Sequence, residues 1–260
     1  MNRIAKTVNS ISKKFGYRLI KIDKSNWSDA FVGISKFEKS ILNICSKFSM
    51  TGFERMYFLI KAIEQIKNNK IQGDFVECGV WKGGNLILFQ KMIEKLNISK
   101  KIYAYDTFKG MTEPGKFDLT FKKESAKKIL HVLKKKNVDP KKNIVLAECS
   151  LNDVIKNYKK NTKFNKNLIC TKGPVEKTLT VKKNIPKKIS ILRLDTDWYE
   201  STKIELEILF PLLVKDGILI IDDYGYWGGA KKAVDQYFFK KNVALFKIDF
   251  TSRFVIKKYI

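Results

Sequence analysis

Short apolar runs alternate with segments of helical periodicity from residue 73 onward, and this alternation restricts the fold more than any other feature of the chain. The strand-like runs are residues 74–77, 101–105, 167–171, 189–194 and 218–221. The helix-like segments are residues 85–95, 125–136, 150–158, 202–213 and 231–240. Strands that alternate with helices form βαβ units, so the pattern predicts an α/β fold around a mostly parallel sheet.

Both ends of the chain depart from this alternation. Residues 50–69 have helical spacing, and Thr51 with Glu54 predicts a capping box at the start of that helix. Residues 1–50 lack alternation and are expected to form a helical cap, a lid or an oligomer contact, with residues 51–260 as the main domain. Residues 243–249 and 254–259 predict an antiparallel hairpin. The long stretch 107–121 contains Gly110, Pro114 and Gly115, which predicts a mobile loop.

Two acidic pairs follow neighbouring strand-like runs. Asp195 and Asp197 come after residues 189–194, and Asp222 and Asp223 come after residues 218–221. In parallel α/β sheets the carboxyl ends of the strands face the ligand, and four carboxylates gathered there repel one another unless a cation or protons compensate them. The pattern predicts an oxygen-rich Mg²⁺ site with an adjacent general base. The alternative is that some of these carboxylates cap helices.

A glycine-rich turn, VECGVWKGG, follows the first strand-like run. Gly79 suits a tight turn, and Gly83 and Gly84 would allow a cofactor to approach the backbone. The spacing differs from the G-x-G-x-x-G fingerprint of dinucleotide sites and fits a cofactor without a pyrophosphate. Asp106 ends the next run, where an acidic side chain can accept hydrogen bonds from ribose hydroxyls. A purely structural turn and a loop cap are the alternatives for these two elements.

Composition excludes several classes of protein. The net charge of +26 comes almost entirely from lysine, whereas nucleic-acid recognition favours arginine, so a nucleic-acid partner is not expected. His131 is the only histidine and lies in a lysine-rich segment, which argues against a Ser–His–Asp triad. The cysteines are scattered, which argues against a zinc knuckle. No apolar run reaches the roughly 20 residues of a membrane span, and no signal peptide is evident, so a cytoplasmic location is expected.

Five segments of the chain resemble the macrocin O-methyltransferase family. They are GDFVECGVWKGG, YAYDTFKGM, KGPVEKTL, LRLDTDWYEST and GILIIDDYGYWGGAKKAVDQYF, in order from about Met50 to Phe239. The family consists of S-adenosylmethionine-dependent, Mg²⁺-dependent enzymes that act on sugar hydroxyls. The resemblance implies a Rossmann-like class I methyltransferase sheet, mostly parallel with a C-terminal antiparallel strand, preceded by an N-terminal helical appendage.

The resemblance also implies a set of site residues. Three aspartates would hold the metal: Asp195, Asp222 and Asp223. Catechol-type relatives use a lysine base just after the first metal aspartate; no lysine is present there, so the base would be Asp197. The cofactor would lie against the methionine-end contacts Glu77 and Gly79, the glycines Gly83 and Gly84, the ribose ligand Asp106 and the adenine contacts Gly173, Val175 and Glu176.

The expected function is therefore Mg²⁺-dependent O-methylation, with S-adenosylmethionine as methyl donor. The acceptor would be a sugar or glycoside, such as a surface-glycan or nucleotide-sugar precursor, and a homo-oligomer is expected. Two alternatives remain from the sequence. One is an RNA-modifying methyltransferase that uses the basic surface, and the other is a cofactor-binding module without turnover.

Overall fold

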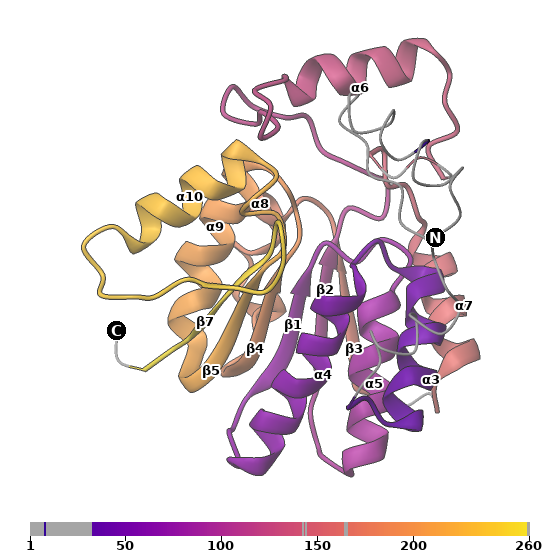
Figure 1. Ribbon diagram of the computed structural model, residues 1–260, viewed down its shortest axis with the longest axis vertical. Helices are drawn as coiled ribbons and strands as arrows, with labels where there is room; N and C mark the ends of the chain where they lie inside the picture. Colours follow the sequence, from indigo (N-terminus) through magenta and orange to yellow (C-terminus); the bar gives the residue numbers. More distant parts are fainter. Residues whose placement is uncertain (1–7, 9–32, 142, 144, 164–165, 259–260) are drawn as a thin grey trace. The chain divides into compact units, whose positions relative to one another are not determined.

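The protein is built around a seven-stranded sheet (Figure 1). The computed structural model describes residues 8, 33–141, 143, 145–163 and 166–258. The sheet order is β3-β2-β1-β4-β5-β7-β6, with β1 to β5 parallel and β7 antiparallel to both of its neighbours. The strands are β1 (Asp74–Cys78), β2 (Ile102–Asp106), β3 (Leu168–Lys172), β4 (Ile189–Leu194), β5 (Leu213–Ile221), β6 (Phe246–Lys247) and β7 (Arg253–Ile256). This order confirms the predicted α/β class, including the antiparallel C-terminal strand.

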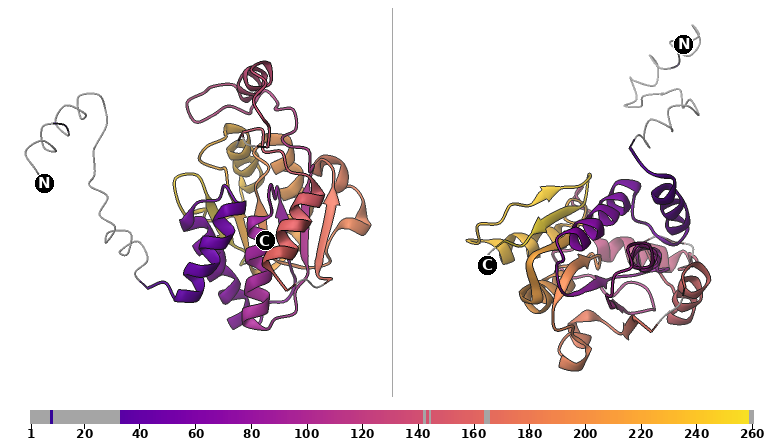
Figure 2. Two further views of the ribbon diagram at one scale, coloured as in Figure 1. Left: turned by 90° about the vertical axis from the view of Figure 1, so that its right-hand side faces the viewer. Right: turned by 90° about the horizontal axis from the view of Figure 1, so that it is seen from below.

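Helices cover both faces of the sheet (Figures 1 and 2). The helices are α3 (Lys36–Cys45), α4 (Phe53–Asn68), α5 (Gly84–Leu96), α6 (Ala126–Lys135), α7 (Leu151–Asn161), α8 (Val175–Thr178), α9 (Tyr199–Leu209) and α10 (Gly228–Phe238). Short 3₁₀ turns occupy Ser46–Phe48, Lys182–Asn184 and Phe210–Leu212. Side chains alternate across a strand, so Val76 and Cys78 of β1 join the core with α9 and α10, while Phe75 stacks on Phe89 of α5, on the opposite face.

The helix starts test the predicted caps. Ser125 and Ser150 cap α6 and α7, because their hydroxyl groups accept hydrogen bonds from the backbone N–H groups of Lys128 and Asp153. The cap predicted at Thr51 is wrong, because α4 begins at Phe53 with no side-chain cap. The Thr51 hydroxyl instead accepts hydrogen bonds from the side chains of two residues far along the chain.

The segment before β5 is the other element that the periodicity misplaces. The predicted helix over residues 202–213 is observed as α9, which begins at Tyr199 and ends at Leu209. A 3₁₀ turn containing Pro211 follows, because proline does not continue an α-helix, and Leu213 already belongs to β5. Apolar residues continue from α9 through the 3₁₀ turn into β5, so the sequence pattern does not mark where α9 ends.

The N-terminal cap predicted over residues 1–50 lies largely outside the described residues, and its role stays a prediction. Contacts group Ser40–Ile260 as one compact unit. Residues 107–121 form an irregular loop, which leads to α6 beyond the carboxyl ends of the strands (Figure 1). Within the described part of the chain, every helix is too short or too polar to cross a membrane.

Candidate active site

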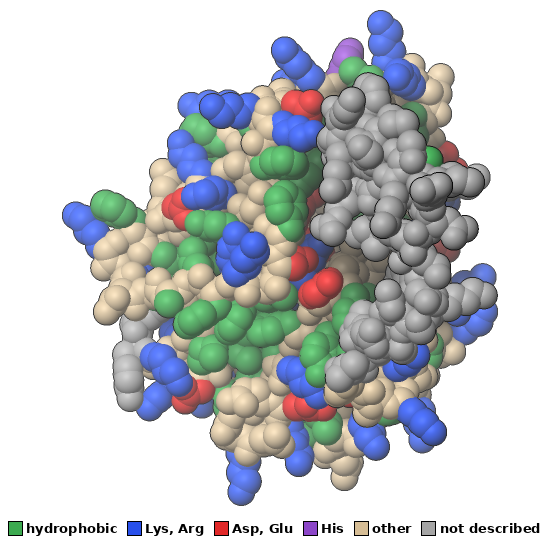
Figure 3. Space-filling model, in the orientation of Figure 1, with side chains coloured by type: hydrophobic (Ala, Val, Ile, Leu, Met, Phe, Trp, Pro, Cys, Tyr) green, Lys and Arg blue, Asp and Glu red, His purple; other side chains and the backbone are tan. Residues whose placement is uncertain are grey.

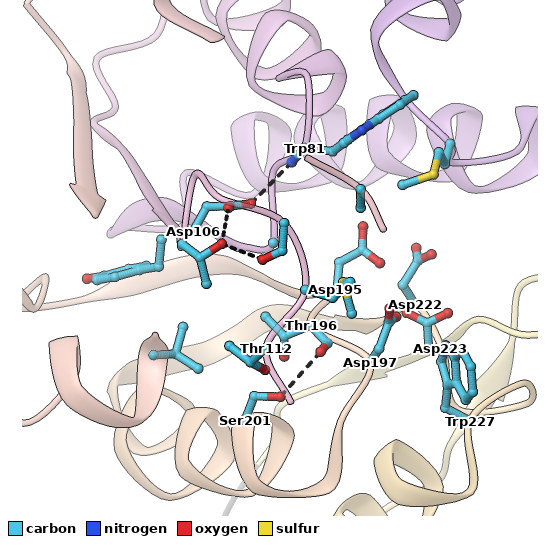
Figure 4. A pocket seen from close by; sticks show the side chains of 18 of the residues that line it. Trp81, Asp106, Thr112, Asp195, Thr196, Asp197, Ser201, Asp222, Asp223 and Trp227 are labelled. Carbon is cyan, nitrogen blue, oxygen red and sulfur yellow. Dashed lines mark hydrogen bonds between the residues drawn. The ribbon is translucent and has the colours of Figure 1, made fainter. Parts of the chain in front are cut away.

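A cavity of about 400 Å³ opens at the carboxyl ends of β1, β2, β4 and β5. It is lined by residues of the turn that follows each of these strands, and by residues of the 107–121 loop and α6. Figure 4 shows Asp106 at one side of the cavity and the aspartates that follow β4 and β5 at the other. The predicted site residues that line it are Gly79, Asp106, Gly173, Val175, Glu176, Asp195, Asp197, Asp222 and Asp223.

Three carboxylates converge in this cavity. Oxygen atoms of Asp195, Asp197 and Asp223 all lie within 4.8 Å of one another. Asp223 Oδ2 is buried and has no hydrogen-bond partner. A buried carboxylate oxygen that lacks a donor is costly unless a cation or proton meets it, and carboxylate oxygens are the ligands that Mg²⁺ prefers. The donor set therefore fits a hard divalent cation.

Asp222 lies next to this cluster but is directed elsewhere. Its Oδ1 accepts a hydrogen bond of 2.5 Å from Arg193, and its Oδ2 pairs with Arg55 of α4. The structure thus brings together two of the three predicted metal ligands, Asp195 and Asp223, and adds Asp197, the predicted base. Each carboxylate oxygen has two lone pairs, so Asp222 keeps acceptor capacity beside its arginine partners.

Arg193 organises the floor of the site. It is 1 % exposed and lies in β4, directly opposite Glu77 of β1. One guanidinium nitrogen is 2.7 Å from both Glu77 Oε1 and Asp195 Oδ2, and the other donates to Thr51 at 2.9 Å and to Asp222. Sequence reasoning missed this residue. The signal was a charged residue inside the strand-like run ISILRL, since a charged side chain in a buried strand needs a buried partner.

Burial raises the pKa of every aspartate in the cluster. The pKa of Asp195 rises to about 6, an effect that Arg193 opposes, and that of Asp222 rises to about 6 against the same guanidinium. Burial raises the pKa of Asp197 to about 7, and burial together with the neighbouring Asp197 charge raises that of Asp223 well above its usual range. A bound cation would favour the charged forms of these groups and lower their pKa values again.

Asp197 has an unusual backbone. Its φ angle is +69°, in the left-handed region that non-glycine residues rarely adopt. Aspartate and asparagine tolerate this region better than most residues, and such conformations cluster at functional sites. A tight turn in which the Trp198 N–H donates to Thr196 O at 2.8 Å holds the residue there.

The cofactor side of the cavity is built around Asp106. Its Oδ2 accepts hydrogen bonds from the N–H groups of Val80 at 2.7 Å and Trp81 at 3.2 Å, and its Oδ1 accepts from Phe108 N–H at 2.7 Å. The loop-capping role is therefore present, and a ribose hydroxyl would use the acceptor capacity that remains. Gly79 has φ of +80°, and a Cβ there would lie 1.9 Å from the carbonyl oxygen of Asp195. Only glycine lets these two strand ends approach so closely.

Glu77, Gly83 and Gly84 lie outside the cavity lining. Glu77 is buried against Arg193 and Asn85. A Cβ on Gly83 would lie 3.1 Å from a methyl group of Val154. The space beside Gly84 is filled by the chain between α3 and α4. In this structure Gly83 and Gly84 therefore pack against other segments of the same chain.

Replacing Gly84 with alanine is expected to destabilise the protein by about 1–3 kcal/mol, because a Cβ would overpack this contact. The new atom would lie 2.8 Å from the Cys45 carbonyl oxygen and 2.6 Å from Ser49 Cβ. Gly115→Ala is the control, since its Cβ would meet nothing closer than 3.5 Å. Urea unfolding of both variants tests this; equal midpoints would show that the contact is not restrictive.

The sheet order, the antiparallel last strands and the cavity above β1 and β4 define a class I O-methyltransferase fold. The solved structure of the O-methyltransferase NovP superposes with a TM-score of 0.69 at 26 % sequence identity, covering 82 % of this chain and 83 % of that one. The calicheamicin methyltransferase CalS11 superposes with a TM-score of 0.58 at 17 % identity, over 88 % of this chain and 95 % of that one, which supports the fold alone.

The chain belongs to the macrocin-O-methyltransferase (TylF) family, whose model matches residues 44–257. It is 28 % identical over 197 residues to a demethyldecarbamoylnovobiocin O-methyltransferase of Streptomyces niveus, covering 75 % of this chain and 70 % of that protein. It is 30 % identical over 191 residues to a rhamnosyl-tetracenomycin-C 4'-O-methyltransferase of Streptomyces olivaceus, covering 73 % and 67 %. The predicted family is thus confirmed, and the chain is an O-methyltransferase.

Proposed function

We propose that this enzyme transfers the methyl group of S-adenosylmethionine to a hydroxyl of a sugar or glycoside with the help of Mg²⁺. The observation that carries the proposal is the convergence of Asp195, Asp197 and Asp223 around a buried, unpartnered carboxylate oxygen inside the cavity. Two relatives support the acceptor class, because their names specify a rhamnosyl 4'-O-methyltransferase and a mycinamicin III 3''-O-methyltransferase of Micromonospora griseorubida.

Asp195 and Asp223 would hold the metal, with Asp222 as the third ligand that the family resemblance implies. Mg²⁺, when bound, would favour deprotonation of a hydroxyl and stabilise the negative charge that develops on its oxygen. The arginines next to Asp222 would limit the repulsion among the carboxylates.

Asp197 would accept the proton of the acceptor hydroxyl. Its carboxylate lies beside Asp223 and faces the cavity, within the cluster that defines the reaction centre. Gly79, Asp106 and Gly173–Glu176 would orient the methyl donor, whose positively charged sulfonium suits an acid-rich cavity. Most of the rate enhancement would come from positioning the hydroxyl in line with the methyl group and from the fixed charges around it.

The alternatives have less support. Lysine and arginine side chains are dispersed over the visible face of the molecule, and acidic and apolar side chains lie between them (Figure 3). RNA binding normally requires a continuous basic surface. A cofactor-binding module without turnover would have no need for three converging carboxylates.

Removal of divalent cations is expected to lower methyl transfer by about 100-fold or more, because the charge on the acceptor oxygen would lose its main stabiliser. The test is a methyl-transfer screen against nucleotide sugars, simple glycosides and surface-glycan precursors, with Mg²⁺ or with EDTA. Binding of S-adenosylhomocysteine in EDTA serves as the control for folding. Undiminished turnover in EDTA would remove the metal from the proposal, and methylation of RNA in place of sugars would support the alternative function.

A further inference from the structure

A buried aspartate of the 107–121 loop is bonded to the start of α9. Asp118 is 1 % exposed, and its Oδ1 accepts a hydrogen bond of 2.8 Å from the backbone N–H of Tyr199, the first residue of α9. Its Oδ2 accepts one of 2.7 Å from the N–H of Gly115. The N-cap residue of α9, Trp198, makes no side-chain cap of its own. A carboxylate at a helix N-terminus meets free N–H groups and the positive end of the helix dipole, so Asp118 caps α9 from a distant segment.

The same part of the loop also contacts the start of α10. The carbonyl oxygen of Leu119 accepts a hydrogen bond of 2.7 Å from the N–H of Gly228, the first residue of α10. The next residue, Gly229, leaves the space that the Asp118 carboxylate occupies, because a Cβ there would lie 1.8 Å from Asp118 Oδ1. The loop is therefore fixed to the two helices that follow the aspartates of the reaction centre.

The contacts with α9 come directly after the proposed base in the sequence. Asp197 is followed by Trp198 and Tyr199, and both of these residues donate to the loop. The indole N–H of Trp198 donates to the carbonyl oxygen of Thr112 at 3.1 Å, and Thr112 lines the cavity together with Asp197. The left-handed backbone of Asp197, with φ of +69°, persists only if the surrounding structure supports it. The loop provides that support at the two residues that follow.

We propose that Asp118 is a positioning residue for methyl transfer. By fixing the start of α9 to the 107–121 loop, it keeps Asp197 directed at the acceptor hydroxyl. Asp118 is outside the cavity lining, so it would act through Asp197 without touching the acceptor or the methyl donor. This inference rests on the proposed function, because it takes Asp197 as the base. Misplacing a reacting group by about 1 Å can lower a rate about 100-fold, so a remote hydrogen bond can have a large effect on kcat.

Asp118→Ala is expected to lower kcat about 10- to 100-fold with the acceptor that the methyl-transfer screen identifies. The Mg²⁺ concentration for half-maximal activity and the calorimetric affinity for S-adenosylhomocysteine should change little, since Asp118 lies outside the carboxylate cluster and the cavity lining. In the Asp197→Asn background the same substitution should lower kcat by less than about threefold, because the base that Asp118 positions is already absent. A general loss of packing would instead lower kcat by the same factor in both backgrounds.

Ser150→Ala is the matched control, because it removes the N-terminal cap of another helix, α7, outside the cavity lining. It should retain kcat. Hydrogen exchange of the full-length protein needs no acceptor: amide groups of residues 107–121 and of the start of α9 should exchange faster in Asp118→Ala and at an unchanged rate in Ser150→Ala. If Asp118→Ala does not fold, Asp118→Asn replaces it, since the amide has one oxygen for the two N–H groups, of Tyr199 and Gly115, that the two carboxylate oxygens accept.

Three results would each overturn the inference and leave the proposed function intact. They are an undiminished kcat in Asp118→Ala or its asparagine replacement, an equal fold loss with and without the Asp197 carboxylate, and an equal loss of kcat in Ser150→Ala. If no sugar hydroxyl is methylated, the proposed function fails. Hydrogen exchange then still decides whether Asp118 fixes the loop, because unchanged exchange in Asp118→Ala would overturn that part as well.

Discussion

Replacing Asp197 with asparagine is expected to lower kcat by about 100- to 10,000-fold, the range over which a general base contributes. The amide has nearly the shape of the carboxylate but cannot accept the proton of the acceptor hydroxyl. Asparagine also tolerates the left-handed backbone at this position, where φ is +69°. The loss should therefore report on chemistry and not on a rearranged turn, and the measurement is kcat at saturating Mg²⁺ with an acceptor identified by the screen.

The same variant separates two roles for Asp197, because its carboxylate lies close enough to Asp195 and Asp223 to contact a shared cation. Loss of a general base should change the Mg²⁺ concentration for half-maximal activity little, whereas loss of a metal ligand should raise it strongly. Asp223→Asn provides the comparison, since it removes a proposed metal ligand. Full methyl transfer by Asp197→Asn would exclude the residue as the base. A metal requirement shifted as far as in Asp223→Asn would assign it to the metal.

The sequence predicts the elements that local pattern determines. The run ISILRL followed by Asp195 places β4 with its observed bounds, because a short apolar run that ends in a carboxylate fits a buried strand that opens into a site. The serine caps of α6 and α7 are equally local, since the capping hydroxyl and the backbone N–H group that donates to it lie three residues apart. These signals need no knowledge of the tertiary fold.

Contacts between distant segments could not be predicted in this way. Glu77 and Arg193 are 116 residues apart and meet only because β4 lies beside β1 in the sheet. From the local sequence Thr51 resembles a helix cap, but in the folded chain its hydroxyl accepts a hydrogen bond from the Arg193 guanidinium. For the same reason Asp222 could be placed at the site from the sequence, but its two arginine partners could not.

Replacing Arg193 with methionine is expected to destabilise the folded protein by about 3–5 kcal/mol, as for other buried ion pairs that lose one partner. The substitution leaves Glu77, Asp195 and Asp222 without the guanidinium they share. The measurement is urea unfolding in EDTA, so that no metal substitutes for the lost charge. Arg253→Met is the control, because Arg253 is partly exposed and donates only to backbone carbonyls nearby.

This destabilisation should depend on pH in a defined direction. Burial raises the pKa of Glu77 to about 7 even though Arg193 lowers it, so removal of the arginine raises it further. A carboxyl whose pKa is higher in the folded state than in the unfolded state loses its stabilising contribution as the pH rises through the folded value. The penalty for Arg193→Met should thus be larger at about pH 8 than at about pH 5.5, where Glu77 is protonated in the folded protein. A loss in the free energy of unfolding that does not vary with pH would show that Arg193 acts by filling space. In that case Arg193→Lys, which keeps the charge with fewer donors, should be as unstable as Arg193→Met.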